Sequence, residues 1–121
     1  MIETGVDLIE IERIEQAIER HGDPFLRRIF TSRELISCKG RADSLAGRFA
    51  VKEAVSKALG TGIGEFSWTE IEIVRDSQGK PQLELHNKAL EKAQEMGIKA
   101  WSISLSHTET HAIGMAVALI E

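Results

Sequence analysis

The chain has 121 residues, of which 42% are hydrophobic and 28% charged, and it contains only 2 prolines. This length and composition predict one globular domain, residues 1–121, with a single hydrophobic core, and they exclude long disordered segments. No apolar run approaches the ~20 residues of a membrane span. The first ten residues carry three acidic side chains and no basic one, unlike a secretory signal. We therefore expect a cytoplasmic protein without a membrane partner.

The net charge of −4 is unevenly distributed along the chain. Residues 13–57 hold ten Lys and Arg side chains against six acidic ones, so this segment is basic within an acidic protein. Such an asymmetry favours an acidic partner that is met through one face. A solvated helical surface is the alternative for any single arginine. We expect a protein partner and no nucleic acid.

Cys38 is the only cysteine. A single thiol excludes an intrachain disulfide and a cysteine-based zinc cluster. Because no neighbouring residue supports a catalytic thiol, we interpret Cys38 as a small, partly buried hydrophobic residue.

The N-terminal segment predicts a strand followed by helices. In Ile2–Ile9, alternate residues fall on opposite faces of a strand, and Asp7 projects from the face opposite Val6. From Glu10, apolar residues recur at helical spacing until His21–Pro24 ends the helix. A second short helix follows over Phe25–Ile29.

The middle of the chain predicts two further helices. Thr31 or Ser32, with Glu34 behind it, has the pattern of a helix start. Asp43 or Ser44 is the expected cap of a long helix, which the glycines of residues 60–64 end.

The C-terminal half predicts strands and one helix. Alternation over Trp68–Arg75, turn residues at 76–79 and a return over Pro81–Leu85 indicate a hairpin. A helix over Asn87–Met96 and strands over residues 100–106 and 112–120 complete the chain. The predicted fold class is α+β, with a small, largely antiparallel sheet packed against the long helix.

Glu53 and Lys57 lie on one stripe of the long helix, together with Phe49, Ser56 and Gly60. As an isolated pair at i,i+4 they would be a common surface ion pair that contributes about 0.2–0.5 kcal/mol to the helix. The glycine run beyond them permits close approach of a ligand to the backbone. It is not a P-loop, because a P-loop precedes its helix.

Two segments resemble the signature motifs of the 4'-phosphopantetheinyl transferases. They are Gly5-Val6-Asp7 and Arg48-Phe49-Ala50-Val51-Lys52-Glu53-Ala54-Val55-Ser56-Lys57. The resemblance to the short acyl carrier protein synthase group of this family extends over nearly the whole chain, through Phe30-Thr31, Gly60-Thr61-Gly62, Gly79-Lys80-Pro81 and Ser104-Leu105-Ser106-His107.

The resemblance implies transfer of the phosphopantetheine arm of coenzyme A to a serine of an acyl carrier protein, with release of adenosine 3',5'-bisphosphate. Asp7 and Glu53 would bind Mg²⁺, which takes one or two carboxylates at phosphate sites. Lys57 would bind phosphate. The base is either Glu53 or a metal-bound water.

The family pattern also implies the residues around the coenzyme and the assembly. The coenzyme-binding residues would be Arg48, Ser56, Gly60, Thr61, Gly62, Gly79, Lys80, Pro81, Ser106 and His107. Short members are homotrimers, so sites could be shared between copies. For Gly79 and Pro81, an ordinary hairpin turn is an equally good interpretation.

Carrier proteins of this family are acidic helical bundles, which makes the basic residues Arg13, Arg20, Arg27 and Arg28 the expected docking surface. His107 and His111 are four residues apart, but they lie in a predicted hairpin turn without a third ligand, so we expect no zinc. His111 stands where relatives often carry an aromatic residue. The alternative functions are a non-catalytic coenzyme- or nucleotide-binding module and a metal-dependent phosphohydrolase.

Overall fold

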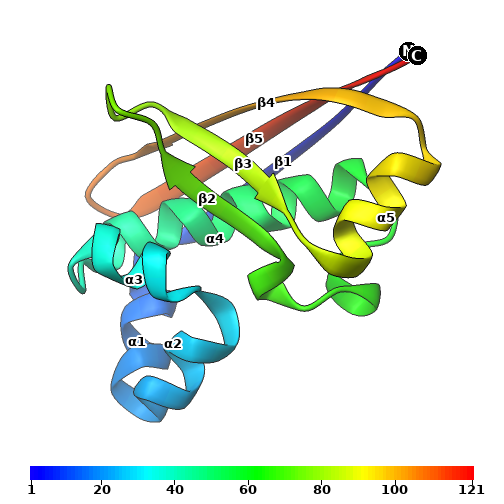
Figure 1. Cartoon of the computed structure of the whole chain (residues 1–121). Coiled ribbons are helices and arrows are strands. Elements are labelled where there is room, and N and C mark those ends of the chain that lie inside the picture. The colour runs from blue at the N-terminus through cyan, green and yellow to red at the C-terminus, as the bar shows by residue number, and fades with distance from the viewer.

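The computed structural model describes all residues 1–121 (Figure 1). Strands and helices alternate in groups, and the two chain ends lie side by side. The elements are β1 (Ile2–Glu10), α1 (Ile11–His21), α2 (Asp23–Ile29), α3 (Ser32–Cys38), α4 (Ala42–Ala58), the 3₁₀ turns η1 (Ile63–Glu65) and η2 (Trp68–Glu70), β2 (Ile71–Arg75), β3 (Pro81–Leu85), α5 (Asn87–Glu95), β4 (Ile98–His107) and β5 (His111–Ile120).

The strands form two antiparallel sheets, one of three strands in the order β1-β5-β4 and one made of the β2-β3 hairpin. The α+β class is confirmed, although the strands divide between two sheets. The long helix α4 lies between the sheets, with the β2-β3 hairpin on one side and the three-stranded sheet on the other (Figure 1).

Three glycine contacts bring α4 very close to the three-stranded sheet. A side chain at Gly5 of β1 would overlap the carbonyl oxygen of Ala54, and one at Gly114 of β5 would lie 2.5 Å from the carbonyl carbon of Ala50. Nearer the start of α4, a side chain at Gly47 would lie 2.8 Å from Leu105 of β4. The helix therefore crosses β4, β5 and β1 in turn, with backbone almost touching backbone at two of the crossings.

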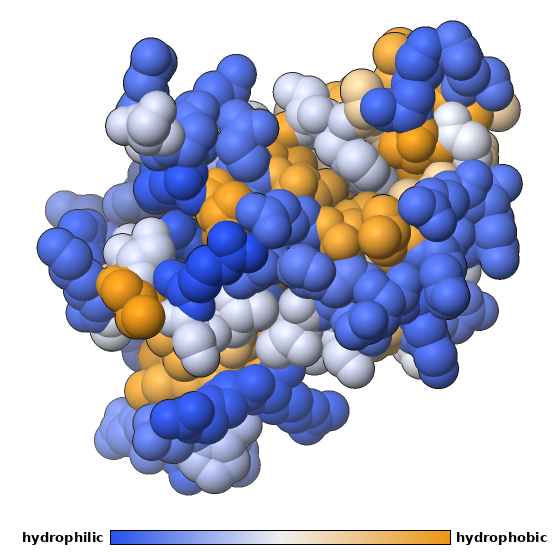
Figure 2. Space-filling view, in the orientation of Figure 1, coloured by the Kyte–Doolittle hydropathy of each residue, from blue (hydrophilic) through white to orange (hydrophobic).

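The buried apolar residues form two clusters, where the composition had predicted one core. The first joins the second half of α4 to β2, β5 and α5 and includes Val51, Val55 and Ile71. The second joins the first half of α4 to α1, α2 and α3 and includes Leu45 and Phe30. In the space-filling view, apolar atoms show between hydrophilic side chains on the hairpin side of the molecule (Figure 2).

Several predicted boundaries are confirmed and three are wrong. The helix start predicted at Thr31 or Ser32 is confirmed, with Thr31 as the N-cap and Glu34 completing a capping box. Helix α2 begins at Asp23, because Pro24 fits the first turn of a helix. Helix α4 begins at Ala42 after Arg41, which makes no side-chain cap, so neither Asp43 nor Ser44 is its N-cap.

The third difference is that Trp68–Glu70 form the 3₁₀ turn η2 instead of the start of the predicted strand. Cys38 is 1% exposed, more deeply buried than expected. None of the helices combines the length and the apolar character that crossing a membrane requires.

Candidate active site

Asp7 and Lys57 meet where β1 passes beside the second half of α4. Asp7 lies two residues beyond Gly5, so it faces the helix as Gly5 does. It also stands opposite Gly114 in the β1-β5 ladder, the residue at which the backbone of α4 touches β5. The Lys57 ammonium donates hydrogen bonds to the Val6 carbonyl oxygen at 2.9 Å and to Asp7 Oδ1 at 3.2 Å. Lys57 is therefore paired with a distant acid and makes no ion pair with Glu53, its i,i+4 neighbour.

Glu53 lies one helical turn before Lys57, on the same stripe of α4. It is half-buried, and its carboxylate accepts no hydrogen bond from the protein. Burial raises the pKa of Glu53 above its ordinary value, and the negative charge of Asp7 raises it further, while Lys57 opposes the shift. Two carboxylates from separate elements thus lie close enough to repel each other beside one ammonium.

This arrangement fits a hard divalent cation. Mg²⁺ prefers carboxylate oxygens and keeps several waters or phosphate oxygens in its shell, so two acids are a sufficient protein contribution. Asp7 is 20% exposed and Glu53 is half-buried, so both can reach a ligand that enters from solvent. A cation between them would also remove their mutual repulsion.

Part of the predicted coenzyme set lies beside this group. Gly60 and Gly62 follow Lys57 and have φ of 85° and 67°, values that favour glycine. The Gly62 amide donates to the Ser56 carbonyl oxygen at 3.2 Å, which folds the loop back on the end of α4. Ser56 itself is fully buried, and its hydroxyl donates to the Glu53 carbonyl oxygen at 2.7 Å. Thr61 lies exposed between the two glycines.

Arg48 lies in the interior, although the family pattern had it beside the coenzyme. The side chain is 1% exposed, and Nη2 donates to Ser37 Oγ at 2.8 Å. Nε is buried without a hydrogen-bond partner. The guanidinium therefore retains unused donor capacity close to the surface residue Ser37.

The remaining coenzyme residues lie at the β4 edge of the sheet, away from Asp7 on the β1 edge. Lys80 and Pro81 line a small recess next to Trp101–Ile103 of β4. Gly79 forms the hairpin turn, where its carbonyl accepts a hydrogen bond from Arg75. The ordinary structural interpretation of this turn therefore holds, and it does not exclude a ligand.

His107 and Ser106 lie at the far end of α4. His107 Nε2 is 4.0 Å from Asp43 in the first turn of the helix. Asp43 and Glu53 are ten residues apart, about 15 Å along a helix. His107, Thr108 and Arg41 line an open cleft of about 630 Å³. His107 therefore makes no contact with the acid pair, although the register places it across β5 and only two residues along the sheet from Asp7.

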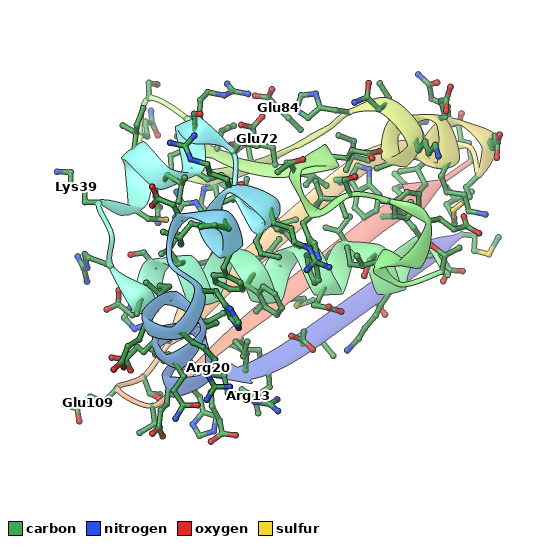
Figure 3. All side chains as sticks on the ribbon, turned by 90° about the horizontal axis from the view of Figure 1, so that it is seen from below. Arg13, Arg20, Lys39, Glu72, Glu84 and Glu109 are labelled. Atoms are coloured by element: carbon green, nitrogen blue, oxygen red, sulfur yellow. The ribbon has the colours of Figure 1, made fainter.

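The four arginines of the predicted docking surface are exposed and form no ion pair or side-chain hydrogen bond. Arg13 and Arg20 are seven residues apart, and thus on one face of α1, and both are labelled in the view from below (Figure 3). Arg27 and Arg28 belong to the neighbouring helix α2. These four arginines, called the basic surface below, are available to a partner, although the same two helices carry four acids, Glu12, Glu15, Glu19 and Asp23.

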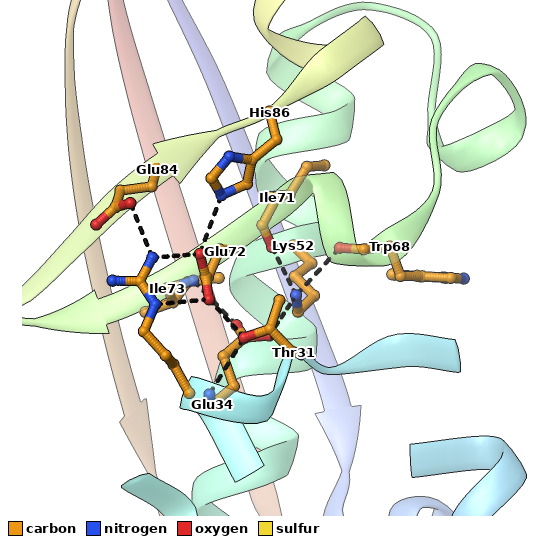
Figure 4. Close-up of polar contacts among 10 residues, drawn as sticks. Thr31, Glu34, Lys52, Trp68, Ile71, Glu72, Ile73, Glu84 and His86 are labelled. Carbon is orange, nitrogen blue, oxygen red and sulfur yellow. Dashed lines mark hydrogen bonds and ion pairs between the residues drawn. The ribbon is translucent and has the colours of Figure 1, made fainter. Parts of the chain in front are cut away.

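Sequence reasoning missed a polar network that joins α3, α4 and the hairpin (Figure 4). Its buried part is the ion pair between Lys52 and Glu34, both 0% exposed and 2.8 Å apart. Its outer part is Glu72, which receives hydrogen bonds from Arg33 and Thr31 and contacts His86. Burial favours the neutral acid, but these bonds outweigh it and lower the pKa of Glu72 to about 2.

Glu72, Glu84 and His86 could in principle hold a metal, since their ligand atoms lie within 4.8 Å of one another. Arg33 already occupies this position, with ion pairs to Glu72 at 2.6 Å and Glu84 at 2.9 Å. The guanidinium supplies the positive charge, and we interpret the cluster as structural. His107 and His111 are not part of it, and no zinc cluster forms around them.

Comparison with known proteins decides the family. The sequence model of the 4'-phosphopantetheinyl transferase superfamily matches residues 3–116. The chain belongs to this superfamily. The transferase is 48% identical to the holo-[acyl-carrier-protein] synthase of Herpetosiphon aurantiacus, over 98% of this chain and 99% of that protein. It is 49% identical to the synthase of Moorella thermoacetica, over 100% and 94% of the two chains.

A solved structure agrees with these relatives. The Helicobacter pylori holo-[acyl-carrier-protein] synthase in complex with coenzyme A superimposes on this transferase with a TM-score of 0.88 and 38% identity, over 98% of this chain and 100% of that one. The fold of this transferase and the order of its motifs are thus those of the superfamily.

Proposed function

We propose that residues 1–121 form one transferase domain that moves 4'-phosphopantetheine from coenzyme A to a serine of an apo acyl carrier protein, with Mg²⁺ as cofactor. The observation that carries the proposal is the meeting of Asp7, Glu53 and Lys57 at one place, from two elements, in a chain that matches the superfamily over residues 3–116. The relatives named holo-[acyl-carrier-protein] synthase support the choice of substrates.

In the proposed reaction, the serine oxygen attacks the phosphorus that carries the pantetheine arm. The bond from that phosphorus to the bridging oxygen of the pyrophosphate breaks, and adenosine 3',5'-bisphosphate leaves with the electron pair. Mg²⁺ bound by Asp7 and Glu53 would offset the charge of the pyrophosphate. Lys57 contributes a mobile positive charge next to the leaving phosphate.

The serine proton needs an acceptor, and Glu53 is the acceptor that this structure favours. Its carboxylate accepts no hydrogen bond from the protein. Burial and Asp7 raise its pKa in the metal-free protein, and Mg²⁺ bound by the same carboxylate would oppose this shift, so the role requires an oxygen of Glu53 that the metal leaves free. A metal-bound water is the alternative acceptor, since a bound metal would lower its pKa.

The coenzyme would lie between copies of the chain, in a homotrimer. His107, Lys80 and Pro81 lie along the β4 edge, whereas Asp7 lies on β1 at the opposite edge of the same sheet. If the β4 edge of one copy packed against the β1 edge of the next, His107, Lys80 and Pro81 of the first copy would lie near Asp7 of the second. The outer face of the sheet supports association, because Val6, Leu8 and Met115 are 46–63% exposed there.

The basic surface on α1 and α2 is the proposed docking site of the carrier, since its arginines have no partners within the chain. An acidic carrier helix would complement it.

Mass spectrometry tests the proposed activity directly. The protein is mixed with coenzyme A, Mg²⁺ and an apo acyl carrier protein, and we expect the carrier to gain the mass of one phosphopantetheine on a serine. Tight coenzyme binding without any gain would favour a binding module. Hydrolysis of the coenzyme without transfer would favour a phosphohydrolase.

Substitution tests the proposed metal ligands. Asp7→Ala and Glu53→Ala should each abolish transfer while the fold persists, since neither side chain belongs to an apolar cluster. Glu84→Ala is the control, because it removes an acid from the Arg33 cluster. Full turnover in either acid variant would rule out the proposed metal site.

A further inference from the structure

Lys52 lies next to Glu53 within the motif of α4, and the proposed mechanism leaves it without a role. Its side chain is 0% exposed. The ammonium donates to Glu34 Oε1 at 2.8 Å, to the Ile71 carbonyl oxygen at 2.5 Å and to the Trp68 carbonyl oxygen at 3.1 Å (Figure 4). An ammonium has three donors. All three are therefore used within the protein, and none remains for a phosphate.

The carboxylate of Glu34 also uses both of its oxygens in hydrogen bonds within the protein. Oε1 also accepts a hydrogen bond from the Thr31 amide at 2.9 Å, and Oε2 accepts one from the Ile73 amide at 2.9 Å. The pair thus ties α4 to α3, η2 and β2 at a single buried point (Figure 4). Separating the pair would leave a buried charge without a partner. The Lys52–Glu34 pair, called the anchor below, therefore favours a single arrangement of these four elements.

The opposite side of α4 is fixed by a different contact. Ala54 touches the backbone of β1 at Gly5, and Ala50 touches β5 at Gly114. Successive residues of an α-helix point about 100° apart, so Lys52, Glu53 and Ala54 point in three directions. Lys52 holds the helix to the hairpin side and Ala54 meets the sheet. Glu53 lies between the two contacts, at the edge that β1 and Asp7 share.

We propose that Lys52 is a positioning residue: its anchor to Glu34 and to the carbonyls of η2 and β2 fixes the rotation of α4, and so holds Glu53 where it binds the divalent cation together with Asp7. The inference rests on the proposed function of Asp7 and Glu53. Groups that bind a metal or substrate have to be held within about 0.5 Å and 10–20°. A small rotation of α4 is therefore enough to separate the two acids.

The test compares Lys52→Met with Arg33→Met. Arg33 belongs to the same network but is exposed and does not contact Lys52. Both substitutions remove a cation and a set of hydrogen bonds, so both should lower the melting temperature. Mn²⁺ affinity of the free protein is measured by electron paramagnetic resonance, and kcat and KM for coenzyme A are measured in the transfer assay.

We expect Lys52→Met to weaken Mn²⁺ binding and to lower kcat, each by at least about tenfold, with KM for coenzyme A within about threefold of the wild type. Arg33→Met should leave all three values within about twofold. Unchanged Mn²⁺ affinity in folded Lys52→Met would overturn the proposal. So would equal losses in both variants, because the effect would then follow stability alone.

A second variant covers the case in which Lys52→Met does not fold. Replacing both partners, as Glu34→Met with Lys52→Met, leaves no buried charge unpaired and is often tolerated. The same Mn²⁺ and kcat losses are expected in this double variant. If it folds with full Mn²⁺ affinity, or if neither variant folds, Lys52 is a folding residue and the proposal is wrong. Failure of the wild type to bind Mn²⁺ would instead refute the proposed metal site.

Discussion

Asp7 and Glu53 hold two like charges near each other, and this arrangement costs folding stability. The only cation beside them is Lys57, whose ammonium bonds Asp7 at 3.2 Å and leaves Glu53 without a hydrogen bond. A surface glutamate would avoid both the burial and the repulsion that raise the pKa of Glu53. The three side chains are therefore better explained by a ligand that they bind than by the stability of the chain alone.

Glu53→Gln should stabilise the metal-free protein. Because the pKa of Glu53 is raised in the folded state, the wild type loses stability as the pH rises from below the ordinary value of 4.5 through the folded-state pKa. Glutamine does not ionise. We expect equal melting temperatures at low pH after correction for the neutral substitution, and a melting temperature a few degrees higher for Glu53→Gln at pH 7. Thermal melts in a chelator measure this difference.

Glu109→Gln is the control for this experiment, since Glu109 is exposed and forms no ion pair. It should melt as the wild type does at every pH. Adding Mg²⁺ should raise the melting temperature of the wild type but not that of Glu53→Gln, because only a bound ligand stabilises the folded state. A lower stability of Glu53→Gln at pH 7 would contradict the assigned repulsion.

At the scale of elements, α4 carries most of the site, and its position was only partly predictable. The i,i+4 stripe, the helix start at Thr31 or Ser32 and the strand over Ile2–Ile9 follow from local patterns and were predicted correctly. The start of α4 was missed because Arg41 provides no side-chain cap. The pairing of Lys57 with Asp7 joins residues 50 positions apart, and no local pattern encodes such a contact.

The contacts of Gly5 and Gly114 could not be predicted from local sequence patterns either. No local pattern marks either glycine as a contact point, yet each is the place where α4 touches the sheet. Likewise, Lys52 and Glu34 are 18 residues apart, and nothing local in the sequence shows that both are fully buried and paired with each other.

Gly114→Ala should displace α4 from the sheet. The new methyl group would lie 2.5 Å from the Ala50 carbonyl carbon, and backbone cannot move aside as a flexible side chain does. Overpacking of this kind costs typically about 1–3 kcal/mol of unfolding free energy. Transfer should fall by at least about tenfold as well, because moving the helix separates Glu53 from Asp7.

Urea unfolding and the transfer assay measure these two effects. Gly64→Ala is the matched control, since its new methyl group would meet no atom within 4 Å. It should keep both the stability and the activity of the wild type. Equal behaviour of the two alanine variants would show that the close crossing of α4 and β5 is not required.

At the scale of the whole molecule, charge is separated by region. The protein is acidic overall, with a net charge of −4, while α1 and α2 present unpaired arginines at one end (Figure 3). Four acids of the same helices, Glu12, Glu15, Glu19 and Asp23, balance the arginines in number, so an acidic partner would have to meet the arginines directly. The separation was visible in the sequence, but the placement of Arg13 and Arg20 on one face depends on the helix.

The double variant Arg13→Glu with Arg20→Glu should raise KM for the carrier by about tenfold or more, because like charges would then face the carrier. KM for coenzyme A should not change. Increasing salt should raise the wild-type KM for the carrier, since salt screens exposed charges. The KM values of the wild type and the double variant should therefore become more similar at high salt. Lys88→Glu, on exposed and unpaired Lys88 of α5, is the control. A carrier KM that is insensitive to both salt and charge reversal would place docking elsewhere.

The outer face of the three-stranded sheet and the divided site point to the same assembly. Ile2, Leu8 and Ile113 are 41–63% exposed although the chain has an otherwise ordinary apolar content. His107 and Asp7 occupy opposite edges of that sheet. Association through this face would cover the apolar residues and bring the edge of one copy to the acids of the next, which neither edge achieves alone.

Mixing two inactive variants tests this shared site. Asp7→Ala removes the acid and His107→Ala removes the histidine, so each variant alone should have little activity. If a site takes Asp7 from one copy and His107 from its neighbour, co-refolding equal amounts should restore about a quarter of wild-type sites in randomly mixed closed rings. Introducing Met115→Glu on the apolar face into both variants should produce monomers and prevent the recovery. Light scattering measures the mass of the assembly, and we expect three times the monomer mass for the wild type. Mixed trimers without recovered activity would show that each copy completes its own site.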